Sequence, residues 1–115
     1  MDILKSNKHW KCKLLLFSGR PDPEWQPGLQ VIEKLLVYAN EIPASADTSD
    51  FQPPLGYRGA LIHNGSYTIT AYKGRLEIRN ADAIIIKPDE ERRFERLILE
   101  TAPEELRLLA MQQFD

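Results

Sequence analysis

Cysteine and histidine are scarce in this chain of 115 residues, and their scarcity excludes some kinds of site. The single cysteine, Cys12, cannot form an internal disulfide, which favours a reducing compartment such as the cytoplasm. The two histidines, His9 and His63, lie far apart in the sequence, with no cysteine pair near either of them. Zinc sites use His and Cys ligands at short, regular spacings, so we expect no metal centre.

Long apolar runs and glycine-rich loops are also missing. No apolar run approaches the ~20 residues of a membrane-spanning helix, and the first eight residues lack the apolar stretch of a signal peptide. The sequence has no phosphate-binding or dinucleotide-binding glycine loop and no Gly-x-Ser-x-Gly nucleophile motif. We therefore expect a cytoplasmic protein without a membrane segment or cofactor, and we assign no catalytic residue.

The composition is typical of a single globular domain, which we place over residues 1–115. Hydrophobic residues make up 43% of the chain and charged residues 28%, and the net charge is −2. Residues 1–8 are expected to be flexible. The stretch 40–54 contains three prolines and many small polar residues, so we expect a mobile loop there and leave open whether it is a lid.

Hydrophobic spacing predicts the first half of the secondary structure. Apolar and polar residues alternate over 9–17, which predicts a strand with one buried face. Helical spacing then predicts a helix from Pro27 to Asn40, which Pro43 ends. Further strands are expected over 60–63, 67–72 and 76–79, and a fourth over 83–86 if that apolar run is not helical.

Two helices are expected after these strands. The first begins at the acidic turn 88–91, where carboxylates favour the positive end of a helix dipole, and it buries Phe94, Leu97 and Ile98. The second begins after Thr101, which has capping-box spacing to Glu104.

Turn signals determine how the predicted strands pair. Asn64-Gly65 and Lys73-Gly74 favour tight hairpins, with His63 exposed at the first hairpin tip. Strands joined by such turns are antiparallel, and the helices lie at both ends of the strand block. The order is strand, helix, three or four strands, and two helices. It predicts an α+β fold, an antiparallel sheet of about four to five strands with helices packed on one face.

The segment SGRPDPEW, residues 18–25, combines an arginine and an aromatic ring with residues that restrict the backbone. Its prolines disfavour the helical region for the residue before each, so Arg20 and Asp22 should project in different directions from an extended path. In one interpretation, Arg20 lies beside the N–H groups of the following helix and binds a carboxylate or phosphate. In the other, Asp22 caps that helix, Arg20 pairs with an acid, and Trp25 fills the edge of the core.

The segment PLGYRG, residues 54–59, has similar chemistry at the start of a predicted strand. Two glycines bracket Tyr57 and Arg58, and strand alternation sends these two side chains to opposite faces. If Tyr57 faces the core, Arg58 projects from the sheet. Glycine at a strand start often marks a bulge or a close backbone approach, and Gly59 could instead serve to avoid one of the two tryptophans.

The chain resembles a group of small bacterial proteins of unknown function. They share an SGRP(N/D)PxW segment after a first strand, an LGYRG segment in the middle, and an acidic-then-apolar helix near the end. The matching stretches here are 17–25, 55–59 and 89–99, with Asp22 where asparagine is commoner. Because no activity is assigned to the group, the resemblance supports the position of a site and implies no reaction.

We predict a non-enzymatic binding or interaction module that recognises an anionic group. That group would be a carboxylate on a partner protein or part of a small phosphate-bearing molecule. Two arginines that converge on one spot repel each other unless an acid or anion lies between them. The candidate ligand-binding residues are Arg20, Asp22, Trp25, Tyr57 and Arg58.

Two alternatives and one assembly state stay open. A small enzyme could use Arg20 and Arg58 to stabilise a negatively charged transition state, although the sequence offers no persuasive general base. A basic sheet face with tyrosines could bind single-stranded nucleic acid, which the net negative charge disfavours. An uncovered sheet edge would permit a homo-oligomer. The basic face would comprise Arg58, Lys73, Arg75, Arg79, Tyr67 and Tyr72.

Overall fold

The computed structural model describes residues 9–15, 22–44 and 59–112. Residues 1–8 and most of the predicted loop 40–54 lie outside these ranges, so their expected flexibility stays a prediction. None of the helices in the described ranges is long and apolar enough to cross a membrane.

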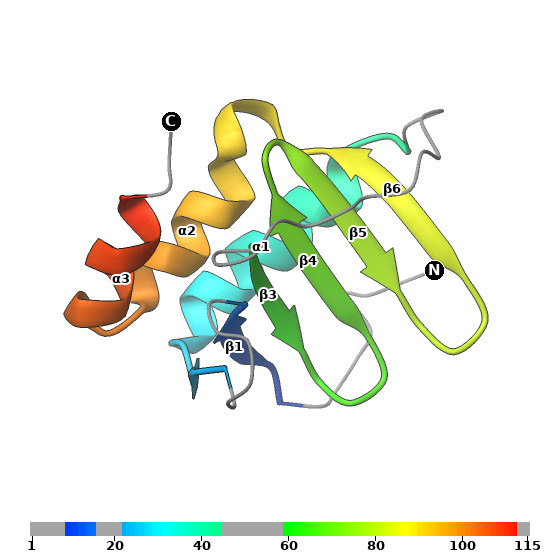
Figure 1. Ribbon diagram of the computed structural model, residues 1–115. Helices are drawn as coiled ribbons and strands as arrows, with labels where there is room; N and C mark the ends of the chain where they lie inside the picture. The colour runs from blue at the N-terminus through cyan, green and yellow to red at the C-terminus, as the bar shows by residue number, and fades with distance from the viewer. Residues whose placement is uncertain (1–8, 16–21, 45–58, 113–115) are drawn as a thin grey trace.

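Within the described ranges, six strands form one antiparallel sheet (Figure 1). Across the sheet the order is β2-β1-β3-β4-β5-β6, so β3 to β6 follow one another as a meander. The predicted α+β class and antiparallel pairing are confirmed. The sheet is slightly larger than expected because two residues of the segment 18–25 form an edge strand, too short to show any alternation. The strands are β1 (Lys11–Leu14), β2 (Glu24–Trp25), β3 (Ala60–His63), β4 (Thr68–Tyr72), β5 (Arg75–Arg79) and β6 (Ile84–Pro88).

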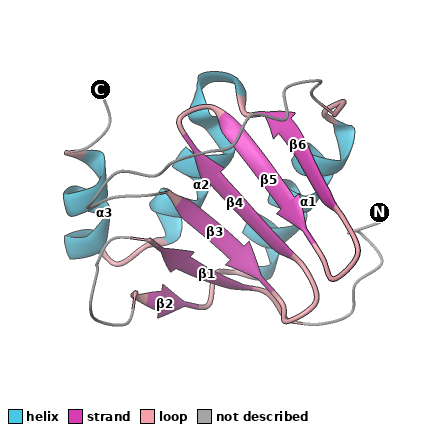
Figure 2. Cartoon of the chain, turned by 45° about the vertical axis from the view of Figure 1, so that its right-hand side comes forward, coloured by secondary structure: helices cyan, strands magenta, loops and turns pink. Residues whose placement is uncertain are grey.

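Helices α1 and α2 cover one face of this sheet, and α3 packs against α2 (Figures 1 and 2). Helix α2 lies against β3 and β4 and also contacts α1, so it is the central helix of the layer. A short 3-10 turn, η2 (Glu90–Arg92), leads from β6 into α2. The helices are α1 (Leu29–Glu41), α2 (Arg93–Thr101) and α3 (Glu104–Met111).

Strand register aligns the apolar side chains that face the helices. Cys12, Ile62, Ile69 and Ile78 form one row across the sheet, because each is the cross-strand partner of the next. All four are buried, as the period-two pattern predicts. The helices close the core with Ile32, Leu35, Leu36, Ala39, Phe94, Ile98 and Leu99.

The start of α3 differs from the prediction. Pro103 is the N-cap residue of α3, and no side chain caps the helix, so the expected capping box is wrong. Thr101 instead ends α2 and donates its hydroxyl to the carbonyl of Ile98 at 2.8 Å. The reason is Pro103, which favours an extended conformation in the preceding residue, and Ala102 is extended at φ −72° and ψ 151°.

The hairpin turns follow their sequence signals. Lys73 and Gly74 both have positive φ, 48° and 84°, as a two-residue type I′ turn requires. The Asn64 turn is longer than predicted, since β4 begins at Thr68. The Asn64 side chain holds this longer turn by accepting the N–H groups of Ser66 at 2.9 Å and of Tyr67 at 2.8 Å.

Candidate functional site

The predicted ligand-binding residues divide between described and undescribed parts of the chain. Arg20, Tyr57 and Arg58 lie outside the described residues, whereas Asp22 and Trp25 lie inside them. Whether all five come together therefore stays a prediction. The residues that flank both segments are described, and their positions can be compared.

The flanks of the two segments meet at one end of the sheet. The N–H of Leu15 donates to the carbonyl of Gly59 at 2.9 Å, and the N–H of Leu14 donates to the carbonyl of Pro23 at 3.1 Å. The turn between β4 and β5 lies at the same end, because β4 ends and β5 begins beside the start of β3. We call this the β4–β5 end of the sheet.

Gly59 permits a close backbone approach at this end. Its φ is +116°, and a Cβ there would lie 2.6 Å from the carbonyl oxygen of Ala71 and 3.0 Å from the Cβ of Tyr72. The predicted close approach is confirmed. The neighbour that requires glycine is strand β4, and neither Trp10 nor Trp25 is among the nearest atoms.

Trp25 is tied into the fold through its polar group. Strand β2 pairs it with Cys12, on the helix-covered face of the sheet. Its indole Nε1 donates to the Oγ1 atom of Thr101 in α2 at 2.9 Å, and its ring packs half-buried against the core. This geometry supports the interpretation in which Trp25 fills the edge of the core, and it leaves a role in binding untested.

Asp22 is half-buried just before β2. It does not cap α1, because Gly28 is the N-cap residue and no side chain caps the helix. The interpretation in which Asp22 caps the following helix is therefore wrong. Strand β2 and the residues after it separate Asp22 from the start of α1.

A buried aspartate connects β6 to α2. The N–H of Asp89 donates to the carbonyl of Gly74 at 2.7 Å, which places the start of α2 at the β4–β5 end. The Asp89 carboxylate accepts the backbone N–H groups of Phe94 at 2.8 Å and Glu95 at 3.2 Å, and the hydroxyl of Tyr38 at 3.3 Å. Burial raises the pKa of Asp89, and these hydrogen bonds oppose the rise.

The two residues before α2 have left-handed backbone conformations. The φ angles are 55° for Glu91 and 56° for Arg92. Such conformations cost roughly 1–2 kcal/mol for each residue other than glycine, so neighbouring contacts must hold them. The Arg92 guanidinium binds the Glu95 carboxylate through two bonds, Nε to Oε1 at 2.9 Å and Nη2 to Oε2 at 2.8 Å. The Glu95 side chain is fully buried, and that of Arg92 is 16% exposed.

Sequence reasoning missed this buried ion pair, although a signal was present. Glu95 lies three residues before Ile98 and four before Leu99, so it belongs to the buried side of α2. A carboxylate on a buried helix face needs a charged or hydrogen-bonding partner, which here is Arg92. Of the three residues that the expected helix buries, Phe94 and Ile98 are buried in the structure, and Leu97 is only partly buried against the core.

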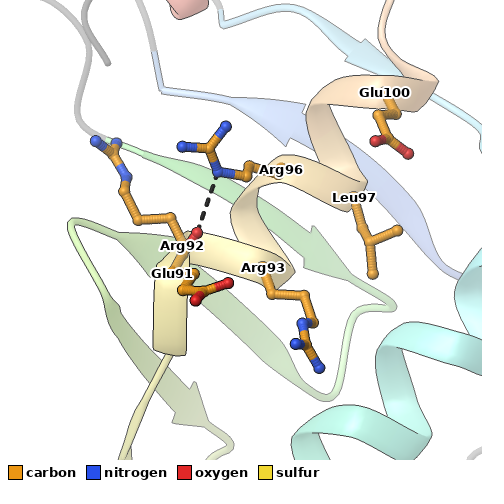
Figure 3. A pocket seen from close by; sticks show the side chains of 6 residues that line it. All are labelled: Glu91, Arg92, Arg93, Arg96, Leu97 and Glu100. Carbon is orange, nitrogen blue, oxygen red and sulfur yellow. Dashed lines mark hydrogen bonds between the residues drawn. The ribbon is translucent and has the colours of Figure 1, made fainter. Parts of the chain in front are cut away.

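The outward side of α2 forms a groove of about 600 Å³, which we call the α2 groove (Figure 3). In Figure 3, the guanidinium groups of Arg92 and Arg96 lie on one side of the helix and that of Arg93 lies on the other. Three guanidinium groups and two carboxylates line the groove. The lining residues are Glu91, Arg92, Arg93, Arg96, Leu97 and Glu100.

Hydrogen bonding and ring contact orient the other two arginines of the groove. Nε of Arg96 donates to the backbone carbonyl of Glu91 at 3.1 Å (Figure 3). The Arg93 guanidinium lies over the ring of Tyr38, 5.7 Å from its centre. Glu100 lies at the opposite end of the groove from Arg92, near Leu97 (Figure 3). The three guanidinium groups therefore lie toward the N-terminus of α2, where Glu91 also lines the groove.

Among the described residues, the sheet face opposite the helices lacks the aromatic platform expected of a single-stranded nucleic-acid site. Tyr67 stacks on Trp10, with ring centres 6.5 Å apart, and packs against the core. Tyr72 is buried. Arg79 forms an ion pair with Glu77 at 2.7 Å. The interleaving of basic groups with accessible tyrosines is therefore not found among the described residues, which disfavours that alternative.

The histidine and cysteine side chains have ordinary structural partners. His63 is partly buried rather than exposed, because its Nε2 lies 2.8 Å from Oε2 of Glu24. This hydrogen bond lowers the pKa of Glu24, and Lys11 lies 3.7 Å from the same carboxylate. Burial raises the pKa of the Cys12 thiol to about 12, which makes it a poor nucleophile. The described part of the chain holds no group of three or more His, Cys, Asp or Glu residues that could bind a metal.

No protein-family model, no curated protein and no solved structure matches this chain. The resemblance to small bacterial proteins of unknown function therefore stays a prediction.

Proposed function

We propose that this protein is a non-enzymatic binding module that recognises an anionic group on a protein partner or small molecule. The observation that carries the proposal is the hydrogen bond between Leu15 and Gly59 at the β4–β5 end of the sheet. Each of these residues adjoins one of the two arginine-bearing segments. Arg58 directly precedes Gly59, and Arg20 follows Leu15 within a short length of chain.

Electrostatics explains why such a site would select an anion. An arginine can donate two parallel N–H bonds to a carboxylate or phosphate, so Arg20 and Arg58 would supply both charge and geometry. Asp22 and Tyr57 would orient these arginines, and Trp25 would form a fixed wall. The α2 groove, which is lined by three arginines and two glutamates, lies at the same end of the sheet. We also propose that the protein acts in the cytoplasm, which agrees with its single, buried cysteine.

The proposal is tested by comparing the wild type with the Arg20→Ala/Arg58→Ala variant in capture experiments from nuclease-treated bacterial lysate. Arg79→Ala is the matched control, because Arg79 is an exposed arginine at the opposite end of β5. A partner captured by the wild type and by Arg79→Ala, but lost by the double variant, would support the proposal. Thermal melting would establish that every variant is folded.

The same variants should be titrated with inorganic phosphate and acetate, and backbone amide signals followed by NMR. We expect saturable shifts in residues at the β4–β5 end that disappear in the double variant. If the double variant keeps every captured protein and every saturable shift, the proposed function is wrong.

A further inference from the structure

Strand β6 (Ile84–Pro88) is the longer of the two edge strands in the described part of the sheet (Figures 1 and 2). We propose that β6 is a self-association surface, through which two copies of this chain form a symmetric antiparallel dimer. The other edge strand, β2, has only two residues and includes the charged Glu24. Because β6 lies outside the two arginine-bearing segments, its self-association is separate from the proposed recognition of an anion.

The outer side of β6 presents backbone groups that can bind a further strand. The N–H of Asp89 donates to the carbonyl of Gly74 at 2.7 Å, so residue 89 bonds toward the β5 side. Because the direction of bonding alternates along an antiparallel pair, residues 85 and 87 also bond toward β5, and Ile84 and Ile86 turn their N–H and C=O groups outward. Within the described ranges no hydrogen bond reaches these outward groups. An open edge of this kind is a template for pairing with another chain.

The ends of the edge determine its register with a second copy. Pro88 has no N–H, and the N–H of Asp82 is already bonded within its own turn. The outward donors of β6 therefore come from Ile84 and Ile86. All of their donors and acceptors are paired when Ile84 lies opposite Ile86 of the second copy, which gives four hydrogen bonds around a two-fold axis at Ile85. In the next register Ile86 lies opposite itself, and the Pro88 ring faces the Ile84 carbonyl, which then has no N–H opposite it.

The apolar side chains of β6 fit this register. Ile85 is the cross-strand partner of the buried Ile78, so it faces the helices. Ile84 and Ile86 therefore lie on the opposite face of the sheet, where the Ile84 side chain is 54% exposed. In the dimer each Ile84 would pack against Ile86 of the second copy, and β-branched side chains directly opposite each other stabilise antiparallel strands.

The charges around the edge also permit self-pairing. Lys87 is the charged residue of β6, and a lysine on an edge strand usually discourages a further strand. Its Nζ instead donates to the carbonyl of Ala39 in α1 at 2.6 Å, which holds the charge against the helix layer. On β5, Arg79 and Glu77 lie beside the two isoleucines that would meet the second copy. The two-fold register therefore places one arginine and one glutamate at the ends of each shared row, so like charges do not face each other.

The size of the edge determines the strength of the expected complex. Five residues of extended strand span about 17 Å, so the paired edges bury less than the roughly 800 Å² per partner of a standard interface. Small interfaces belong to weak complexes, and we expect a dissociation constant of roughly 10 µM to 1 mM. A β6–β6 contact closes on itself, whereas a β6–β2 contact would pair only two residues and leave an edge open. The edge therefore fits β6 of a second copy.

Sedimentation velocity tests the dimer at protein concentrations from about 10 µM to about 1 mM. We expect the average mass of the wild type to rise from that of a monomer toward that of a dimer. Ile84→Lys adds a charge at the edge and should weaken association about tenfold or more. Leu108→Lys in α3 is the matched control, because Leu108 is 55% exposed and gains the same charge, and it should associate as the wild type does. Thermal melting establishes that both variants are folded.

Engineered cysteines test the register. With oxidised glutathione, Ile85→Cys should form a disulfide-linked dimer, because its Cα would lie about 4.5 Å from the Cα of the same residue in the second copy. Ile84→Cys should not, because the corresponding Cα atoms would be more than about 7 Å apart. Cys12 is buried and the pKa of its thiol is raised to about 12, so it does not compete.

Three results of the sedimentation experiment would each overturn the proposal. They are a wild type that stays monomeric at about 1 mM, an Ile84→Lys variant that associates as the wild type does, and loss of association in Leu108→Lys alone. In the first case only a strand from a different protein could occupy the edge, and in the last the interface would lie on α3. Cross-linking through Ile84→Cys but not through Ile85→Cys would overturn the register.

Discussion

Replacing Arg92 with methionine removes one partner of a buried ion pair and should destabilise the protein strongly. The Glu95 carboxylate is fully buried, and the Arg92 guanidinium is its bidentate partner. Breaking such a pair from one side typically costs about 3–5 kcal/mol, because an uncompensated charge remains in the interior. Because Arg92 is 16% exposed, some water can replace it, so we expect about 3 kcal/mol.

A control variant at a surface pair separates burial from the loss of charge alone. Arg79 and Glu77 form an equally short ion pair, but their side chains are 57% and 36% exposed. Exposed pairs contribute about 0–1 kcal/mol, so Arg79→Met should change the free energy of unfolding by less than about 1 kcal/mol. The two variants remove the same charge, and the difference between them measures the effect of burying the carboxylate.

The assay is urea unfolding at pH 7, followed by circular dichroism, with the free energy of unfolding taken from each curve. A domain of this kind is stable by about 5–15 kcal/mol, so Arg92→Met should shift the midpoint clearly and still fold. A change below about 1 kcal/mol would refute the reasoning, because Glu95 would then be hydrated or differently paired in solution.

Three further predictions concern single sites. Gly59→Ala should lower the free energy of unfolding by about 2 kcal/mol or more, because the new methyl group meets a backbone carbonyl at 2.6 Å. Gly28→Ala is the control in the same urea assay. A methyl group there has no atom within 4 Å, so the free energy of unfolding should change by less than about 1 kcal/mol. Glu91→Gly should raise the melting temperature, since glycine relieves a left-handed backbone and stabilises by about 0.5–1 kcal/mol; a lower melting temperature would contradict this. Glu24→Gln should lower the free energy of unfolding by less than about 1 kcal/mol at pH 7, and the loss should become smaller as the pH falls toward about 2. The effect declines toward low pH because the hydrogen bond to His63 lowers the pKa of Glu24 in the folded protein. The ionised Glu24 side chain therefore contributes its full stabilisation above the pKa of the unfolded state, and this stabilisation is lost as the pH falls through the pKa of the folded state. A Glu24→Gln effect on melting temperature that is constant across this pH range would count against the His63 contact.

The sheet and the core were largely predictable because they depend on the regular spacing of apolar residues along the sequence. The alternation around Cys12 and the spacing of Ile32, Leu35 and Leu36 are signals that packing reinforces. The Lys73-Gly74 turn was predictable for a different reason, since both residues adopt a positive φ that glycine favours. Strand β2 was not predictable, because two residues are too few to show an alternation of apolar and polar side chains. They form a strand only because they lie beside β1 and pair with it.

The candidate site was less accessible to sequence reasoning because it depends on contacts between distant elements. The prediction that Gly59 marks a close approach was confirmed, but the strand that approaches it could not be identified from the sequence. Thr101 matched a helix cap and instead accepts the indole N–H of Trp25, a contact between β2 and α2 that no local pattern encodes. The convergence of Arg20 and Arg58 stays a prediction.

The start of α2 shows why a buried ion pair can be retained when it adds little net stability. Replacing both partners, as in Arg92→Met/Glu95→Leu, should recover most of the loss caused by Arg92→Met, because apolar residues of similar size often substitute for buried pairs at little cost. Stability alone therefore does not require Arg92 and Glu95. What the pair does provide is a guanidinium held in one position on a left-handed backbone. The double variant should thus fold nearly as well as the wild type, with a free energy of unfolding within about 1 kcal/mol of it in the urea assay. A loss as large as that caused by Arg92→Met would show that the ion pair adds net stability of its own.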